Sequence, residues 1–294
     1  MLDLLDLNSQ FNNLKKIEDK LFEVKKLQYP SPQIGFDAPE SYGIYKNSGD
    51  WLGTVGNVYQ PLQPKHFFDA VVNSLSNHSE IDLSKMKYNE YKGGRKISFR
   101  VPLKEISFKN KAKLNDVTEV YLDFMTTFDG SGTTNVGLYS KRLVCLNGMT
   151  INVANAQIRK KHTFNKNAEV LTFTHEIGKL AQSVDNFKLF ATALNSIEMT
   201  QAKIDDALTK ITGYNLKDFK SLSTRKQNIV NSINDCIAIE FNDTGATAFG
   251  LLNAITRYNT HIAPSSGRDS EEYVLFDSGA KMNEKAQKYL ETII

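Results

Sequence analysis

The 294-residue sequence predicts an α+β protein in which antiparallel β-hairpins form a small sheet and a helical C-terminal half follows. Two observations predict this class. Residues 50–165 alternate polar and apolar side chains around glycine-containing turns, which is the pattern of paired strands. Residues 166–294 repeat apolar side chains every three or four positions, as amphipathic helices do. Because no linker, repeat or low-complexity segment divides the chain, we expect one domain over residues 27–294.

Residues 1–26 precede this domain and have the apolar spacing of an amphipathic helix. Two roles stay open for the helix. It packs on its own domain, or it is an arm that docks on a neighbouring subunit of a homo-oligomer. The apolar positions are Leu7, Phe11, Leu14, Ile17, Leu21 and Val24.

The composition excludes several classes of protein. A hydrophobic content of 40% with 23% charged residues is typical of a globular chain. No apolar run approaches the roughly 20 residues that span a bilayer, and the N-terminus carries acids where a signal peptide needs positive charge. We therefore expect a protein of the cytoplasm, without a membrane partner. Cys145 and Cys236 lie in apolar surroundings and are expected to be buried free thiols.

The β-rich part begins in a proline-punctuated segment, residues 29–64, that predicts extended chain and turns. Trp51–Tyr59 predicts a short strand, and Pro64 is a suitable first residue of a helix. Residues 86–103 predict the first clear hairpin, because Gly93-Gly94 separates two alternating segments and both glycines tolerate positive φ. In its second strand Ile97, Phe99 and Val101 share one face, while Lys96, Ser98 and Arg100 share the other.

The first hairpin is strongly basic within a chain of net charge +3. Residues 85–113 contain ten basic residues against two acids, Glu90 and Glu105. The basic residues are Lys85, Lys87, Lys92, Arg95, Lys96, Arg100, Lys104, Lys109, Lys111 and Lys113.

A second hairpin is predicted from Asp116, with its turn at Phe128–Gly132 and its second strand over residues 136–146. The second strand carries Lys141-Arg142. We expect a short helix over residues 149–156, entered through Gly148, and then the basic cluster 159–161. The helical half predicts helices over residues 170–194 (one helix or a broken pair), 200–211, 223–237, 244–258 and from about 279.

Four motifs resemble the phage and plasmid proteins of the DUF932 family. They are Trp51-Leu52-Gly53, the stretch 141–147 (KRLVCLN), Lys161-His162-Thr163 and the stretch 247–258 (TAFGLLNAITRY). Residues 148 and 149 are Gly and Met where the family more often has Thr and Leu. The resemblance covers roughly residues 50–292 and implies a mobile-element origin, hence the cytoplasm of a host cell, but no activity. The order of hairpin, hairpin and helix, with basic strands, is also similar at the level of fold to Rad52-like single-strand annealing proteins, and fold alone does not settle function.

Single-stranded-DNA binding is the function that the residues favour, because sequence-independent binding needs cations that follow the phosphates. Tyr88, Tyr91, Phe99 and Tyr139 interleave with these cations and would stack on bases if exposed. The alternative is an ordinary solvated face, with Phe99 and Tyr139 in the core. The predicted phosphate contacts are Lys92, Arg95, Lys96, Arg100, Lys141, Arg142, Arg159, Lys160 and Lys161.

Enzyme candidates are weaker. Cys145 with His162 resembles a nucleophile and base, but nothing in the sequence orients the histidine, and a core cysteine explains Cys145. Glu119, Asp123 and Asp129 would bind a divalent metal in a nuclease, yet ordinary carboxylates on a sheet face and in a turn explain them better. We therefore expect no catalytic residue, metal or cofactor. A non-enzymatic role in phage assembly or host interaction remains the alternative to a DNA-binding, strand-annealing homo-oligomer.

Overall fold

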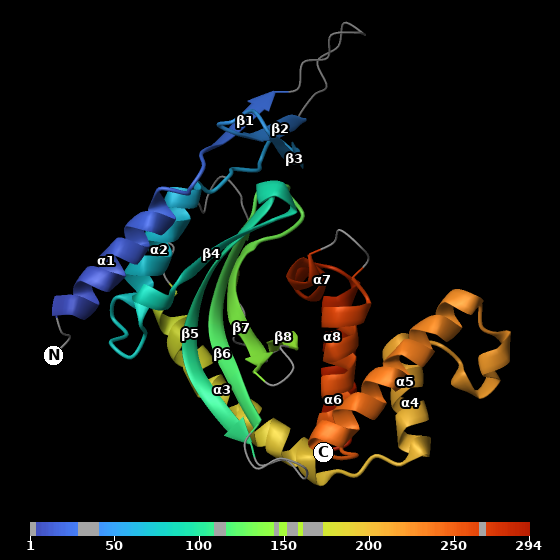
Figure 1. The fold of residues 1–294 in the computed structure, drawn as a ribbon. Helices are drawn as coiled ribbons and strands as arrows, with labels where there is room; N and C mark the ends of the chain where they lie inside the picture. Colours follow the sequence, from blue (N-terminus) through green and yellow to red (C-terminus); the bar gives the residue numbers. More distant parts are fainter. Residues whose placement is uncertain are drawn as a thin grey trace, which may run out of the picture. The chain divides into compact units, whose positions relative to one another are not determined.

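The computed structural model describes residues 4–28, 41–108, 116–143, 147–151, 158–160, 173–264 and 269–294. The fold is α+β, with an antiparallel sheet region followed by a mostly helical C-terminal half, as the sequence predicted (Figure 1).

The chain forms two compact units. Unit 1 consists of residues 1–103, 121–137 and 153–181, and unit 2 of residues 104–120, 138–152 and 182–294. The boundaries fall inside secondary-structure elements. Strands β5 (Lys96–Phe108), β6 (Asp116–Thr127) and β7 (Thr134–Arg142) and helix α3 (Thr174–Ser196) each contribute to both units. For this reason no linker composition marks the division.

Unit 1 begins with helix α1 (Leu4–Glu18), which is shorter than the helix predicted over residues 1–26. The chain leaves the helix because Val24–Gln28 forms strand β1, whose backbone pairs with β2. The helix is attached to its own unit by the side chain of Asn13, whose Nδ2 donates to the carbonyl oxygens of Leu83 and Met86, both at 3.0 Å. Leu83–Lys85 is the short 3-10 helix η1.

A three-stranded antiparallel sheet follows in unit 1, with the order β1-β2-β3 among the described residues. Its other strands are β2 (Tyr42–Lys46) and β3 (Trp51–Val55), and β3 confirms the strand predicted at Trp51. Ile44 and Leu52 are fully buried and anchor this sheet.

Helix α2 (Pro64–Leu75) begins at Pro64, as predicted, where the missing N–H of proline costs no hydrogen bond. Its apolar side chains form the core of unit 1 with the hairpin. The ring centroid of Phe67 lies 5.3 Å from that of Phe99 and 6.3 Å from that of Phe173. Phe124 approaches the same Phe173 at 5.3 Å.

The basic hairpin is confirmed as β4 (Lys87–Tyr91) and β5, with Tyr88 opposite Phe99 and Tyr91 opposite Lys96. Gly93 and Gly94 have positive φ (68° and 89°), as a tight hairpin turn requires. Lys92 also has a positive φ of 52°, so the turn η2 (Lys92–Gly94) is longer than a two-residue loop.

Strands β6 and β7 form the second predicted hairpin, and β8 (Gly148–Ile151) and β9 (Ile158–Lys160) both pair with β7. The order of the described strands is β4-β5-β6-β7-β8 (Figure 1). Strand β9 also pairs with β7. The helix predicted over residues 149–156 is therefore wrong at residues 149–151. There the backbone satisfies its hydrogen bonds on the edge of β7, and β-branched Thr150 and Ile151 suit a strand. Residues 152–157 lie outside the described part.

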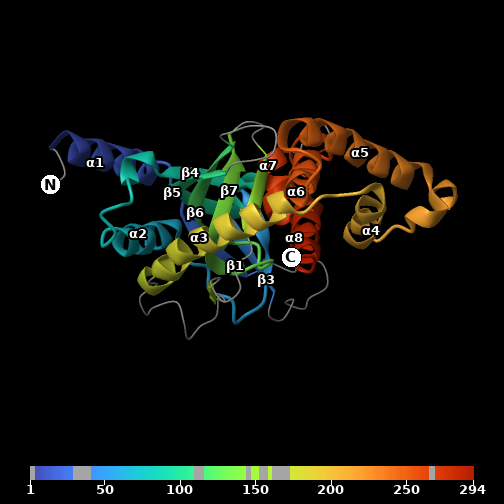
Figure 2. The ribbon, with the colours of Figure 1, turned by 90° about the horizontal axis from the view of Figure 1, so that it is seen from below.

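Unit 2 contains the helices that the 3.6-residue pattern predicted. They are α4 (Gln201–Thr212), α5 (Thr224–Thr244), α6 (Ala248–Arg257) and α8 (Ser278–Glu291), and the long helix α3 enters the same unit. Helix α6 is buried from Ala248 to Thr256 and packs against both α5 and α8, which lie next to it in Figure 2. The π-helical turn η4 (Tyr258–Ile262) and the short helix α7 (Ser270–Phe276) were not predicted.

Local capping signals decide where several of these helices begin and end. The Thr200 hydroxyl accepts from the Lys203 N–H at the start of α4, and Gly213, with φ of 75°, ends the helix. Among the helices of the described ranges, none is long and apolar enough to cross a membrane.

Candidate nucleic-acid interface

Three of the predicted phosphate contacts lie together at the turn of the β4–β5 hairpin. Lys92, Arg95 and Lys96 are all partly exposed there. The Cζ atom of Arg95 lies 4.9 Å from the ring centroid of Trp51, which belongs to β3 and is 44% exposed. We call Trp51, Lys92, Arg95 and Lys96 the hairpin-turn surface; all four belong to unit 1.

The backbone around this surface is fixed by contacts within unit 1. The carbonyl oxygen of Arg95 accepts a hydrogen bond from the N–H of Phe128 at 2.8 Å, which ties the β4–β5 turn to the end of β6. Leu52, next to Trp51, is fully buried and holds the strand in place. The surface is therefore formed by a strand and a hairpin turn whose backbones are hydrogen-bonded within unit 1.

Acidic neighbours reduce the positive charge near the turn. Nζ of Lys46 lies 2.8 Å from Oε2 of Glu90, and a Cβ at Gly94 would collide with the Lys46 side chain. Two lysines of the basic residues 85–113 also form ion pairs. Lys85 pairs with Asp82 at 3.6 Å, and Lys104 pairs with Asp185 at 2.9 Å. The hairpin-turn surface brings three cations together within residues 92–96, all of them partly exposed.

Arg100 does not contribute to a binding surface. Its guanidinium is buried, and Nη2 lies 2.8 Å from Oδ2 of the equally buried Asp123. The alternation of side chains along β5 correctly places Arg100 on the face opposite Ile97, Phe99 and Val101. At Arg100 that face is buried as well. A side chain that is buried in an ion pair cannot reach a phosphate, so we remove Arg100 from the proposed contacts.

The aromatic residues predicted to stack on bases are not available for that role. Phe99, Tyr91 and Tyr139 are buried, as the alternative interpretation of Phe99 and Tyr139 anticipated. Tyr88 is half-buried and its hydroxyl donates to Oε1 of Glu90 at 3.0 Å. Burial, and then the Glu90 charge, raise the pKa of Tyr88. An exposed aromatic residue beside this turn is instead Trp51, the first residue of the strand predicted over residues 51–59.

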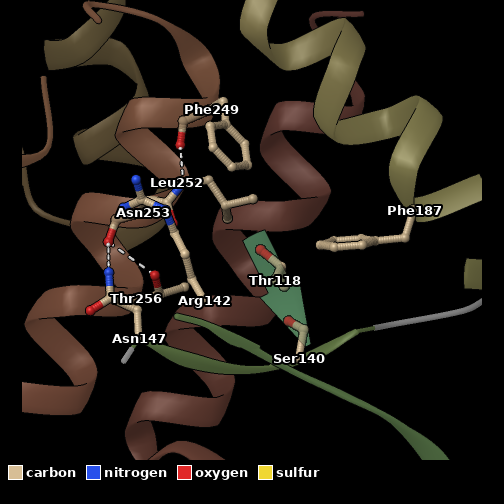
Figure 3. A pocket seen from close by; sticks show the side chains of 9 residues that line it. All are labelled: Thr118, Ser140, Arg142, Asn147, Phe187, Phe249, Leu252, Asn253 and Thr256. Atoms are coloured by element: carbon tan, nitrogen blue, oxygen red, sulfur yellow. Dashed lines mark hydrogen bonds between the residues drawn. The ribbon is translucent and has the colours of Figure 1, made fainter. Parts of the chain in front are cut away.

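Arg142 is also buried, in a polar network inside unit 2 (Figure 3). Its Nη1 lies 2.7 Å from Oε2 of Glu240 on α5. The other carboxylate oxygen, Oε1, lies 3.3 Å from Nη1 of Arg257 and 3.2 Å from Nδ2 of Asn147. Two arginines and an amide therefore compensate the charge of Glu240, which has no exposed surface.

Asn147 connects this network to the π-helical turn. Its Oδ1 lies 3.1 Å from Nε2 of His261, and its Nδ2 also lies 3.2 Å from the carbonyl oxygen of Asn253 on α6. The N–H of Gly148 donates to Oγ1 of Thr260 at 3.3 Å. The stretches 141–147 and 247–258, which are distant in sequence, thus meet in one hydrogen-bonded cluster.

A small cavity lies beside the network, between β6, β7 and α6 (Figure 3). Its volume is about 20 Å³, which accommodates one water molecule and no metabolite. This part of unit 2 is therefore a packing and hydrogen-bonding centre. The lining residues are Thr118, Ser140, Arg142, Asn147, Phe187, Phe249, Leu252, Asn253 and Thr256.

The other predicted contacts are dispersed. Lys141 is partly exposed near the end of β7, opposite Gly148 of β8. Arg159 and Lys160 belong to β9, whose backbone pairs with Asn135 and Thr134. Lys161 lies outside the described residues.

The enzyme candidates find no support in the described residues. Asp123 is bound to Arg100, and Oδ1 of Asp129 accepts from the N–H of Ser131 at 2.9 Å within its own turn. Across the described ranges, no group of three or more His, Cys, Asp or Glu side chains is placed to hold a metal ion. Cys145 and His162 lie outside the described residues. Cys236 is buried and free, as predicted.

Comparison with known proteins gives a match to a protein family. The profile of the family described as "Domain of unknown function (DUF932)" matches residues 51–289, which begin at Trp51 and include both stretches of the buried network. No curated protein and no solved structure matches the chain.

Proposed function

The chain belongs to the DUF932 family, whose name specifies no activity, and we propose from its own geometry that it binds single-stranded DNA without sequence preference. The observation that carries this proposal is the hairpin-turn surface, where Lys92, Arg95 and Lys96 are partly exposed around Trp51. The proposed place of action is the cytoplasm, that of a host cell if the gene belongs to a phage.

Charge and placement support the proposal. The three cations lie within five consecutive residues at one end of a hairpin, so they act on the same stretch of a bound strand. Unlike Arg100 and Arg142, none of them is buried. Contacts of Lys and Arg with phosphate oxygens carry no sequence information, and so the expected binding is sequence-independent. Arg95 and Lys96 sit where the backbone is already fixed, which reduces the entropy lost on binding.

The experiment compares two triple variants with equal changes of charge. Lys92→Gln/Arg95→Gln/Lys96→Gln removes the cations of the hairpin-turn surface. Lys210→Gln/Lys217→Gln/Lys220→Gln removes three exposed lysines of unit 2. Fluorescence anisotropy of a labelled oligothymidylate at low ionic strength gives the affinity of each protein.

The first variant is expected to bind at least roughly tenfold more weakly than wild type, and the second to bind nearly as wild type does, because phosphate contacts are local. Equal affinities of the two variants would overturn the proposed site. Absence of binding by the wild-type protein would overturn the proposed function.

Strand annealing without ATP is the more specific activity that we propose. Annealing requires that two strands meet on one particle, which a homo-oligomer with several hairpin-turn surfaces would provide. The likeness to Rad52-like annealing proteins stays a prediction. Energy transfer between two complementary labelled strands, followed without nucleotide, tests annealing. Acceleration by wild type and not by the Lys92/Arg95/Lys96 variant is the expected result.

An assembly role is the second candidate, favoured by one observation on α1. Leu7 and Phe11 lie four residues apart on the helix and are 48% and 66% exposed. Residues at this spacing form one apolar strip, which a second copy of the chain would cover. The mass in solution of wild type and of Leu7→Lys/Phe11→Lys, with and without DNA, separates the two roles. Large particles whose mass does not change when DNA is added, and which dissociate in the variant, would favour assembly over DNA binding.

A further inference from the structure

We infer that Trp51 and Arg95 form a stacking platform for an unpaired base, which makes the hairpin-turn surface selective for single-stranded over duplex DNA. This inference rests on the proposed function and adds to it the chemical feature of the ligand that is recognised. The ligand is a nucleotide whose base has an open face and whose phosphate lies near a cation.

The exposure of Trp51 is the first observation. Tryptophan is a large aromatic residue that is well buried in most proteins, yet here 44% of it is exposed even with Arg95 over the ring. The neighbouring Leu52 is fully buried, and the Trp51 backbone pairs with Tyr45 of β2. The indole is therefore presented to solvent by a fixed strand.

The position of Arg95 is the second observation. A distance of 4.9 Å from the guanidinium carbon to the ring centroid is within the range of a cation–π contact. A stacked guanidinium uses its flat face against the ring. The N–H donors of a guanidinium lie in its own plane, so a guanidinium that lies flat on a ring keeps them available for phosphate oxygens. One pair of side chains thus offers a ring for a base and a fork of donors for the phosphate.

The aromatic side chains of residues 86–103 do not extend the platform. Tyr91 and Phe99 are buried and Tyr88 is half-buried. Lys92 and Lys96 flank Arg95 in sequence and add charge without an aromatic surface. Loss of Trp51 should therefore remove stacking and leave most of the electrostatic attraction.

Duplex DNA cannot use such a platform without disruption, because both faces of each base are already stacked on neighbouring base pairs. An unpaired base has an open face, and stacking on an aromatic side chain is tolerant of base identity. Alanine substitution of a stacking residue typically lowers affinity by about 5- to 150-fold per base. This range is the expected contribution of Trp51 to the affinity for a single strand.

The test uses the fact that Trp51 is the sole tryptophan of the chain, so its fluorescence reports the platform alone. The full-length protein is titrated with oligothymidylate, with an abasic strand of the same length and with a duplex, all at one salt concentration. We expect oligothymidylate to quench the fluorescence, and the abasic strand and the duplex to quench little. The affinity for the abasic strand should be about 5- to 150-fold lower than for oligothymidylate.

Two variants, followed by anisotropy of labelled strands, complete the test. Trp51→Ala should bind oligothymidylate and the abasic strand with equal affinity, whereas Trp51→Phe keeps an aromatic face and should keep part of the preference. Lys92→Gln/Lys96→Gln should weaken the binding of both strands by the same factor.

If wild type binds the abasic strand as tightly as oligothymidylate, with unchanged fluorescence, the platform is refuted and the proposed function stands. If wild type binds no single strand at low ionic strength, the proposed function is refuted together with the platform.

Discussion

The guanidinium of Arg142 lies 2.7 Å from the carboxylate of Glu240, and the two side chains are only 3% and 0% exposed. This contact joins β7 to α5 inside unit 2 and changes the role of the basic pair Lys141-Arg142. Successive side chains of a strand point to opposite faces, so only one member of such a pair faces the interior. Arg142 is that member, and it supports the fold where the sequence had indicated a phosphate contact.

Removal of the Glu240 carboxylate should be strongly destabilising. Glu240→Ala leaves Arg142 buried without its partner and also removes an ion pair with Arg257. Breaking one partner of a buried pair costs about 3–5 kcal/mol. Urea unfolding followed by circular dichroism measures the loss. Glu284→Ala, which removes an exposed pair with Lys288, is the control and should leave the unfolding midpoint unchanged. Similar midpoints for the two variants would contradict the assigned role of Glu240.

The buried pair of Arg100 and Asp123 in unit 1 gives a second prediction. Arg100→Leu alone should destabilise by about 3–5 kcal/mol, because Asp123 then remains buried and charged. The double variant Arg100→Leu/Asp123→Leu should be clearly more stable than the single one, since apolar side chains replace the pair.

The same double variant tests whether Arg100 binds DNA. Because the guanidinium does not face solvent, the folded double variant should bind oligothymidylate as wild type does. If the double variant lost as much affinity for oligothymidylate as Arg95→Gln does, Arg100 would have to be counted among the DNA-binding residues.

Local signals in the sequence predicted most of the elements, whereas contacts between distant residues decided the roles of the charged ones. Gly93-Gly94, Pro64 and Gly213 mark a turn, a helix start and a helix end through their own backbone preferences. The burial of Arg142 depends on Glu240, 98 residues further along the chain. Likewise, residues 148–151 form a strand because the edge of β7 is beside them, which their own pattern does not indicate.

Two glycines should respond to alanine with opposite signs. A Cβ at Gly53 would lie 2.6 Å from Cα of Asp129, a backbone contact that cannot yield without strain. Gly53→Ala should therefore destabilise by roughly 1–3 kcal/mol. Gly178 is an exposed position within α3 and a Cβ there has open space, so Gly178→Ala should stabilise by about 0.5–1 kcal/mol. Thermal unfolding of both variants measures the difference, and an equal response would refute the close approach at Gly53.

The thiol of Cys236 should be unreactive in the folded protein. Burial raises its pKa to about 11, so the reactive thiolate is scarcer at pH 8 than in a free cysteine, and access is restricted as well. In a Cys145→Ser background Cys236 is the remaining thiol. A disulfide reagent should label it slowly at pH 8 and rapidly after addition of urea. Fast labelling without denaturant would show that Cys236 is accessible.

The same shift predicts how stability depends on pH. Between the ordinary thiol pKa of 9.0 and the raised value of about 11, the unfolded chain loses the proton and the folded chain keeps it. The contribution of Cys236 to the free energy of unfolding is therefore complete below pH 9 and decreases as the pH rises toward 11. Comparison with Cys236→Ala across this range isolates the contribution, and parallel stability curves would contradict the raised pKa.

Trp51 illustrates what a sequence pattern leaves undecided about a binding surface. Its strand could be predicted from the turn signals around it, and the cations from the basic hairpin. That the indole points outward and meets Arg95, 44 residues away in the sequence, follows from the way β3 lies beside the turn within unit 1. An exposed tryptophan cannot be distinguished from a core tryptophan by composition alone.

The most direct test of the central claim is the salt dependence of binding to oligothymidylate, measured for wild type and for Lys92→Gln/Arg95→Gln/Lys96→Gln. For single strands the logarithm of affinity falls with the logarithm of salt concentration, with a slope of about −0.7 per phosphate neutralised. If all three cations contact phosphates, the slope of the variant should be shallower by about 2. Parallel slopes, or no salt-sensitive binding by wild type at low ionic strength, would contradict the claim.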